Sequence, residues 1–221
     1  MSVRSKVATE LGLLALLTTA FLLLFPKRNP WVDFGLATIA LLGLLFSARY
    51  TKNVIWANSP PPFPQPQLKE CVKLTMWITV PVVLLFVLFG VVLGYRQGGW
   101  PAVLERVFNW RLLVVFAAYV VWALVQQTLF QFYLLGRLLV LAPKKWSLLA
   151  VCLTGMGISL VHWPDVYTMI ATALAGIVWS FIYFRYRYIL PLALSHAALG
   201  CTFYACFLGQ DVAAEWKRLL P

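Results

Sequence analysis

The chain has 221 residues, of which 62% are hydrophobic and only 11% are charged. A soluble domain carries about 25% charged residues, and a chain this apolar could not cover its own exterior in water. The composition therefore excludes a soluble protein and predicts an integral, multi-pass membrane protein. Any active or binding site is expected within or beside its helices, because the apolar runs leave no room for a separate soluble domain.

The net charge of +11 comes from 18 Lys and Arg against 7 Asp and Glu. Most of the basic residues lie in short segments between apolar runs, where they suit anionic lipid headgroups and topology signals. No basic stripe is long enough to follow a phosphate backbone, so we expect membrane lipids and no nucleic acid as partners. Lys and Arg are more frequent on the side that carries the N-terminus, which predicts a cytoplasmic N-terminus.

Apolar runs of about 20 residues indicate seven membrane-spanning helices. We expect them at 11–25, 31–48, 73–95, 111–136, 146–163, 166–184 and 188–208. The fourth run stays apolar to Ala142, so it holds either one long, tilted helix or an additional, eighth membrane segment. Lys27 and Arg28 follow the first run and no small-residue cleavage site does, which favours an uncleaved span over a secretory signal. The expected fold is all-α, a polytopic membrane helix bundle of seven or eight transmembrane helices.

Changes in composition divide the chain further. The segment SPPPFPQPQ at 59–67 holds five prolines and cannot be helical. Gly98, Gly99 and Pro101 follow the third apolar run, which indicates a loop and an interfacial helix. The expected divisions are a two-helix N-terminal hairpin (1–58), a proline-rich linker (59–72), a third membrane helix with its interfacial segment (73–110), a core (111–208) and a polar C-terminal tail (209–221).

Few polar side chains lie inside the apolar runs, and each of them needs a partner there. The two histidines of the chain are His162 and His196, and three glutamines, Gln126, Gln127 and Gln131, share one run. Taken singly, such residues are most often interhelical hydrogen-bonding groups. Gln127 and Gln131 are four residues apart on one helix face, so we expect their amides to hydrogen-bond to each other.

The order and spacing of these residues resemble the CAAX-protease and bacteriocin-processing family, the Abi-type glutamic intramembrane proteases. That family carries EExxxR on one helix, FxxxH on the next and HxxxN or HxxxB on a later one, all facing a membrane-embedded cavity. The corresponding segments here are QQTLFQ (126–131), ISLVH (158–162) and HAALG (196–200). The resemblance covers about 111–208, and it implies that the glutamines and histidines surround one cavity.

The departures from the family pattern imply a catalytically degenerate member. The first glutamate of the family is the base that activates water, and the neutral amide of Gln126 cannot take a proton. Gln127 and Gln131 replace a glutamate and an arginine together, which removes an ion pair without stranding a charge. Gly200, at the asparagine position, has no side chain to hold a water or an oxyanion.

We therefore expect no competent catalytic residue among the family-motif positions, which are Gln126, Gln127, Gln131, His162, His196 and Gly200. The predicted role is a non-proteolytic binding, assembly or accessory subunit with a membrane-protein partner. None of the seven acidic residues lies in the middle of an expected span, so none is an obvious substitute for the missing base. The acid nearest a histidine is Asp165, in HWPD, where Pro164 indicates an interfacial turn.

Two alternatives stay open at this point. One is an active intramembrane endopeptidase with a modified centre, in which Asp165 orients His162 or a neighbouring hydroxyl or thiol is the nucleophile. The neighbouring nucleophiles are Ser159, Ser195 and Cys201. The other is a haem- or metal-binding subunit that uses both histidines. We expect no cofactor and no metal, because glutamine is a poor ligand and two histidines leave the coordination shell short.

Overall fold

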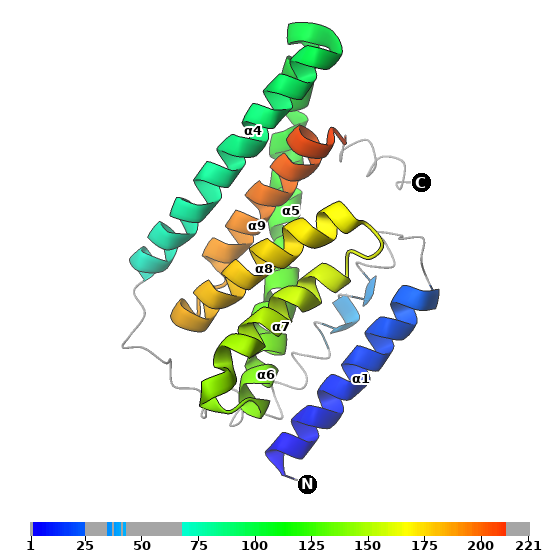
Figure 1. The fold of residues 1–221 in the computed structure, drawn as a ribbon, viewed down its shortest axis with the longest axis vertical. Coiled ribbons are helices and arrows are strands. Elements are labelled where there is room, and N and C mark those ends of the chain that lie inside the picture. Colours follow the sequence, from blue (N-terminus) through cyan, green and yellow to red (C-terminus); the bar gives the residue numbers. More distant parts are fainter. Residues whose placement is uncertain (1, 25–34, 37, 41, 43–67, 211–221) are drawn as a thin grey trace. The chain divides into compact units, whose positions relative to one another are not determined.

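The computed structural model describes residues 2–24, 35, 36, 38–40, 42 and 68–210 of the chain. Every element in these residues is a helix (Figure 1), which confirms the predicted all-α fold. Five helices of the described part are long and apolar enough to cross a membrane: Arg4–Leu24, Leu68–Val107, Arg111–Leu141, Val166–Tyr186 and Leu190–Leu208. These helices support the predicted multi-pass membrane protein.

The predicted count of seven or eight spans is not reached in the described residues. The expected second span, 31–48, and the proline-rich segment 59–67 lie largely or wholly outside them. The expected span 146–163 corresponds to α7 (Ser147–Leu160), which has 14 residues. At 1.5 Å per residue its length is about 21 Å, shorter than the roughly 30 Å of a hydrocarbon core. The count therefore stays a prediction.

Two compact units with interleaved chain segments make up the described fold. The first contains residues 1–67 and 125–189, and the second contains residues 68–124 and 190–221. The expected core, 111–208, contributes to both. The boundary at Leu124 lies within one uninterrupted helical stretch, Arg111–Leu141. The fourth apolar run is thus one long helix, as the first of the two interpretations predicted, and not two membrane segments.

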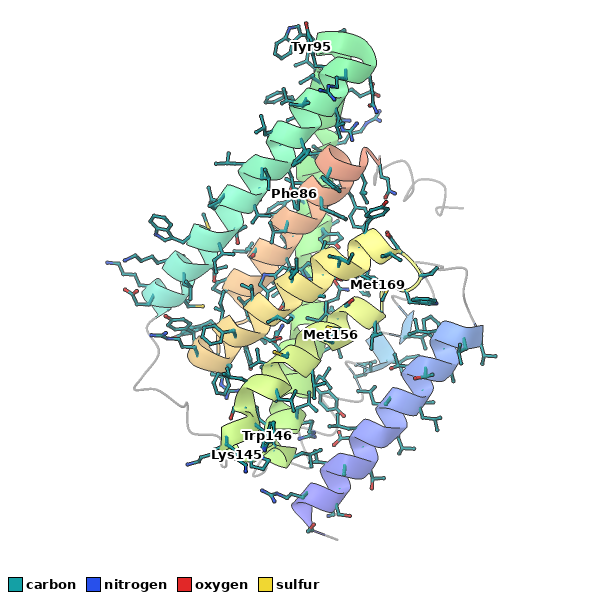
Figure 2. The ribbon with its side chains drawn as sticks, viewed as in Figure 1. Phe86, Tyr95, Lys145, Trp146, Met156 and Met169 are labelled. Carbon is teal, nitrogen blue, oxygen red and sulfur yellow. The ribbon has the colours of Figure 1, made fainter. Side chains whose placement is uncertain are left out.

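The first unit combines α1 with the helices between Val125 and Ile189. Its elements are α1 (Val3–Leu24), the last residues of α5 (Arg111–Gln127), the π-helix η1 (Thr128–Leu135), α6 (Gly136–Leu141), the short η2 (Lys144–Trp146), α7 and α8 (Val166–Tyr186). Helices α7 and α8 run side by side, and η1 packs against both (Figure 1). Figure 2 shows Lys145 and Trp146 where α7 begins, a position that suits an interfacial anchor.

Small residues let α7 and α8 approach closely. A Cβ atom on Gly155 would lie 2.5 Å from the backbone nitrogen of Ile177, and one on Gly176 would lie 3.1 Å from the Cα atom of Gly155. Contacts of this kind are typical of membrane helices, where packing and hydrogen bonds replace the hydrophobic driving force. The two glycines therefore fix how closely these helices pack.

The second unit is built on α4 (Leu68–Val107), with the first part of α5, α9 (Leu190–Thr202) and the π-helix η3 (Phe203–Leu208). Helix α4 begins at Leu68, inside the segment assigned to the linker. Its direction reverses at Gly98 and Gly99, and Gly99 has a positive φ of 66° that favours glycine (Figure 1). The last helical turns then fold back onto the preceding part of α4. The two stretches lie very close together, since a Cβ atom on Gly94 would lie 3.1 Å from the Cα atom of Val103. This confirms the predicted break.

Aromatic contacts and one arginine hold η3 against α4. Phe86, labelled on α4 in Figure 2, packs against Phe203 and Phe207. The ring centroids are 5.5 and 5.9 Å apart. The Arg106 Nε atom donates to the Cys206 carbonyl at 3.0 Å, and Nη2 donates to the Phe207 carbonyl at 3.1 Å. The guanidinium thus satisfies carbonyl groups at the end of a helix, where no further turn can do so.

We expect Gly155→Ala to destabilise the first unit, because the new methyl group would meet backbone atoms of α8. Overpacking of this kind typically costs about 1–3 kcal/mol. The matched control is Gly136→Ala, at a helical glycine where, among the described residues, nothing outside its own stretch of helix lies within 4 Å of the added Cβ. The measurement is the temperature at which half of the protein, purified in mild detergent, is lost from the monodisperse peak. Equal effects of the two substitutions would contradict the close packing of α7 on α8.

Candidate functional site at the family-motif positions

The three motif glutamines lie where α5 passes into η1, and all are buried. The exposed fractions are 9% for Gln126, 1% for Gln127 and 0% for Gln131. Within the described residues, Gln126 Oε1 and both amide atoms of Gln131 have no hydrogen-bond partner. The predicted hydrogen bond between Gln127 and Gln131 was therefore wrong. The helix adopts π geometry from Thr128, whereas the four-residue spacing assumed an α-helix throughout.

This arrangement gives the first unit a neutral polar patch in an apolar environment. A buried amide without a partner costs about 1–3 kcal/mol, so such groups are rarely kept in a packed interior. π-helical turns are also frequent at functional sites. Chemically, the amides of Gln126 and Gln131 can donate and accept hydrogen bonds, but neither can take a proton from water at neutral pH.

His162 lies in the turn between α7 and α8, as the HWPD sequence predicted. Its backbone N–H donates to the Ser159 carbonyl, and its own carbonyl accepts from the backbone N–H of Asp165, both at 2.9 Å. The side chain is half-buried. His162, the last residue of ISLVH, thus sits just beyond α7, which ends at Leu160.

Asp165 caps the start of α8. Its Oδ1 atom accepts from the backbone N–H of Thr168 at 3.2 Å, and Oδ2 accepts from the Thr168 hydroxyl at 2.5 Å. Partial burial opposes ionisation of the carboxyl group, but these hydrogen bonds, one from the Tyr167 backbone and the nearby His162 together hold the pKa of Asp165 below its usual value. Both oxygens are already engaged in helix capping, which does not favour Asp165 as the residue that orients His162.

The hydroxyl groups considered as nucleophiles make contacts between helices. Ser159 Oγ donates to the Met169 carbonyl at 2.8 Å, which links α7 to α8. Ser195 Oγ and Thr79 Oγ1 share a buried hydrogen bond of 2.6 Å between α9 and α4. Bonds of this kind are ordinary interhelical contacts in membrane bundles. They give no support to a serine nucleophile.

His196 and Gly200 lie one turn apart on α9, in the second unit. His196 is buried, and the ring of Tyr119 from α5 meets it edge to face, with centroids 5.8 Å apart. A Cβ atom on Gly200 would lie 2.7 Å from Cε1 of Tyr119 and 3.1 Å from its hydroxyl oxygen. The tyrosine ring therefore occupies the space where a side chain at position 200 would begin. Sequence reasoning missed Tyr119, because nothing in its surrounding run marks it.

Close packing of α5 on α9 explains this arrangement. Three buried alanines, Ala123, Ala193 and Ala197, form a compact cluster, and Tyr119 packs against it with its neighbours on α5. Small residues let helix backbones approach closely. Gly200 extends this small-residue surface by one turn. Because glycine has no side chain, the ring of Tyr119 fits against the helix backbone at this position.

The family-motif positions are divided between the two units. Gln126, Gln127, Gln131 and His162 belong to the first, and His196 and Gly200 belong to the second. The expectation that all of them surround one cavity stays a prediction. Among the described residues, no group of three His, Cys, Asp or Glu side chains is placed to hold a metal ion. The expected lack of a bound metal likewise stays a prediction for elemental analysis.

A carboxylate that sequence reasoning placed outside the first span lies within an apolar helix. Helix α1 begins at Val3, so Glu10 belongs to the candidate span Arg4–Leu24. Its Oε2 atom lies 3.0 Å from Arg137 Nε, and its Oε1 atom accepts from the Tyr133 hydroxyl at 2.5 Å. Both oxygens are engaged, so Glu10 is a poor candidate for a base that activates water.

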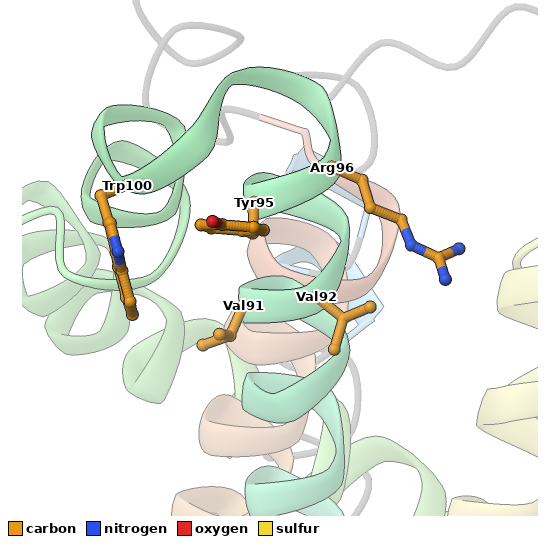
Figure 3. Close-up of a pocket in the computed structure, with 5 residues that line it drawn as sticks. All are labelled: Val91, Val92, Tyr95, Arg96 and Trp100. Carbon is orange, nitrogen blue, oxygen red and sulfur yellow. The ribbon is translucent and has the colours of Figure 1, made fainter.

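A shallow hollow of about 340 Å³ lies on α4, near its reversal of direction. Its lining residues are Val91, Val92, Tyr95, Arg96 and Trp100 (Figure 3). The rings of Tyr95 and Trp100 are 5.8 Å apart, and Arg96 points away from them (Figure 3). Aromatic rings beside a basic residue at the end of an apolar helix are typical interfacial anchors. The hollow contains none of the family-motif positions.

Residues 108–202 match the family model described as type II CAAX prenyl endopeptidase Rce1-like. This region is Rce1-like. It contains all six family-motif positions and agrees closely with the extent expected from the sequence, which confirms the resemblance to the CAAX-protease family. The Rce1-like region makes up a little under half of the chain. No curated protein and no solved structure matches the chain.

We expect Gly200→Asn to destabilise the second unit more than the same change at an open helical glycine. The new side chain would start 2.7 Å from the Tyr119 ring, whereas Gly136→Asn, the control, meets no atom within 4 Å. The double substitution Tyr119→Ala with Gly200→Asn should regain part of the lost heat resistance, since it vacates the space. Heat resistance in mild detergent measures both effects. A Gly200→Asn protein as resistant as the Gly136→Asn control would refute the steric argument.

Proposed function

We propose that this protein is a non-proteolytic relative of the CAAX proteases, which works in the membrane as a binding, assembly or accessory subunit of a membrane-protein complex. The observation that carries the proposal is the buried neutral amide of Gln126 at the position of the family's catalytic base. A carboxylate there could accept a proton from water, and an amide cannot. Loss of a general base typically lowers a rate by about 10² to 10⁴.

Two further features of the Rce1-like region support this proposal. Gln127 and Gln131 replace a charged pair as a unit, so no uncompensated charge is left in the membrane. The Tyr119 ring fills the space beside Gly200, where the family asparagine would project. These departures concern three separate parts of the family's catalytic machinery, and a single compensating residue could not restore them.

The proposed surroundings of the chain are membrane lipids and a partner protein in the same membrane. Helices α1 and α4 expose many large apolar side chains, which suit lipid tails or the apolar face of a partner helix. The excess of Lys and Arg on the N-terminal side supports a cytoplasmic N-terminus and contact with anionic headgroups. A membrane protein is the expected partner, and membrane lipids are the expected surroundings.

An active endopeptidase with a modified centre is the second candidate. It is favoured by one observation, the retention of both motif histidines, His162 and His196, inside the Rce1-like region. A histidine can act as a general base near neutral pH. An assay for cleavage separates the two candidates.

The unmodified protein, reconstituted in liposomes, should not cleave a prenylated CAAX peptide, because the site lacks a base that can take a proton. An active CAAX protease in the same liposomes is the positive control, and mass spectrometry of the peptide is the readout. Gln126→Ala should leave the cellular function nearly intact. Cleavage by the unmodified protein that is abolished by His162→Ala or His196→Ala would establish the endopeptidase instead.

Restoring the family residues should show how many changes separate this site from an active one. We expect Gln126→Glu alone to recover little or no cleavage, because position 131 lacks the arginine and position 200 lacks the asparagine. The best candidate combines Gln126→Glu, Gln127→Glu, Gln131→Arg and Gly200→Asn with Tyr119→Ala, which makes room for the asparagine. The same peptide assay measures both variants, and full activity of the single variant would contradict this expectation.

Purification from native membranes in mild detergent should yield the protein with a larger membrane protein in fixed stoichiometry. Gln126→Ala should keep that partner, because the proposed role does not use the site as a base. Quantitative mass spectrometry against an unrelated multi-pass protein, purified in parallel, gives the stoichiometry. Recovery of the chain without a stoichiometric partner under conditions that preserve known membrane complexes would contradict the accessory role.

A further inference from the structure

We propose that Tyr133 and Arg137 form a carboxylate-binding site on the Rce1-like region, and that helix α1 is held against this region by presenting Glu10 to it. The inference concerns contacts within the first unit and does not depend on whether the protein is proteolytic. Helix α1 lies outside the Rce1-like match at 108–202, and Tyr133 and Arg137 are the residues of that region that hold it.

The geometry of the site matches a carboxylate. Arg137 approaches both oxygens of Glu10, with Nε 3.0 Å from Oε2 and Nη2 donating to Oε1 at 3.3 Å. The Tyr133 hydroxyl adds a donor to Oε1 at 2.5 Å. A guanidinium that faces both oxygens is the arrangement that gives such pairs their directional specificity. An amide at position 10 would offer one acceptor and place an N–H₂ group against the cation.

Burial makes Arg137 dependent on this acid. The side chain is 2% exposed and lies inside the candidate span Arg111–Leu141, one residue beyond the expected span 111–136. The guanidinium carbon is also 5.1 Å from the centroid of the Tyr133 ring, a cation–π contact. An aromatic ring alone does not neutralise a charge, so the site needs an anion, which Glu10 supplies.

Among the described residues, Glu10 makes hydrogen-bonded and charged contacts between α1 and the Rce1-like region. The side chains of α1 are mostly exposed, with Leu16 and Leu17 more than 60% exposed, while Val7 is a buried apolar residue one turn before Glu10. In lipid, apolar side chains gain no hydrophobic free energy by leaving the tails for another apolar surface, so packing and polar contacts carry the association. A charged contact that would be costly to break therefore decides where this helix packs. Within the described residues, α1 packs against α6, the helix that contains Arg137.

Four full-length variants in mild detergent test the proposal: Glu10→Gln, Arg137→Gln, the double variant, and Glu70→Gln as a control. Glu70 is exposed at the start of α4 and belongs to the other unit. Glu10→Gln should be the most heat-sensitive, because it leaves Arg137 charged, buried and without its anion. Arg137→Gln should be milder, because the Glu10 side chain is 31% exposed and can reach water or headgroups. The double variant should be more resistant than Glu10→Gln.

Labelling of a cysteine on α1 reports the position of the helix directly. With Val7→Cys in each background, N-ethylmaleimide should label position 7 slowly in the unmodified protein and severalfold faster with Glu10→Gln. Mass spectrometry measures the labelling of each cysteine over time. The rate at position 7 is divided by the rate at Cys152, which is exposed in α7 and serves as an internal reference. The Glu70→Gln control should leave the ratio unchanged.

Three outcomes would overturn the proposal. The first is a Glu10→Gln protein that matches Glu70→Gln in both labelling and heat resistance. The second is a double variant whose loss equals the sum of the single losses, which would mean that the two residues act independently. The third applies if Glu10→Gln does not fold at all. A double variant that also fails to fold would then reject the pairing, whereas a double variant that folds would support it.

Discussion

Lipid tails offer no hydrogen bonds, so a polar side chain inside a membrane helix must find its partner within the protein. Several polar side chains of the described residues meet that demand. Thr79 and Ser195 bond to each other, Arg106 satisfies the last carbonyl groups of η3, and Arg137 pairs with Glu10. The helices are therefore positioned by a small number of polar contacts, while the apolar surface around them can face either lipid or protein.

Gln126 and Gln131 are exceptions to this rule in the described residues, and they stand at positions where the family has catalytic residues. Under the proposed function, these two buried amides are what is left of a polar site whose charges have been removed in a balanced way. The two side chains of Gln127 and Gln131 have a net charge of zero, as a glutamate and an arginine together would. Loss of only one charge would have been far more costly.

The π-helical turns η1 and η3 add a second constraint. The first lies between α5 and α6 and begins inside the QQTLFQ segment, the second ends the helix that carries HAALG, and each widens the turn by one residue. The amide of Gln131, within η1, makes no hydrogen bond to Gln127, four residues before it. A mutual fit operates between Tyr119 and Gly200, where the ring of one residue fills the space that the other leaves open. In both cases the contacts of a side chain depend on a residue on another turn or another helix.

The sequence by itself determined the all-α membrane fold, the break at Gly98 and Gly99, the turn at HWPD and the family that the region with the glutamines and histidines resembles, and it left open whether the fourth run was one long helix. These features depend on local properties: the length of apolar runs, the backbone preferences of glycine and proline, and the spacing of a few polar residues. Only the tertiary structure decided which residues meet. Glu10 and Arg137 are 127 positions apart. In the sequence alone, Glu10 precedes the expected span 11–25 and Arg137 follows the expected span 111–136. Tyr119 and Gly200 likewise show no pattern until α5 packs against α9. Hydropathy records how much each residue favours lipid, but the choice of a partner depends on geometry between distant segments, which hydropathy does not encode.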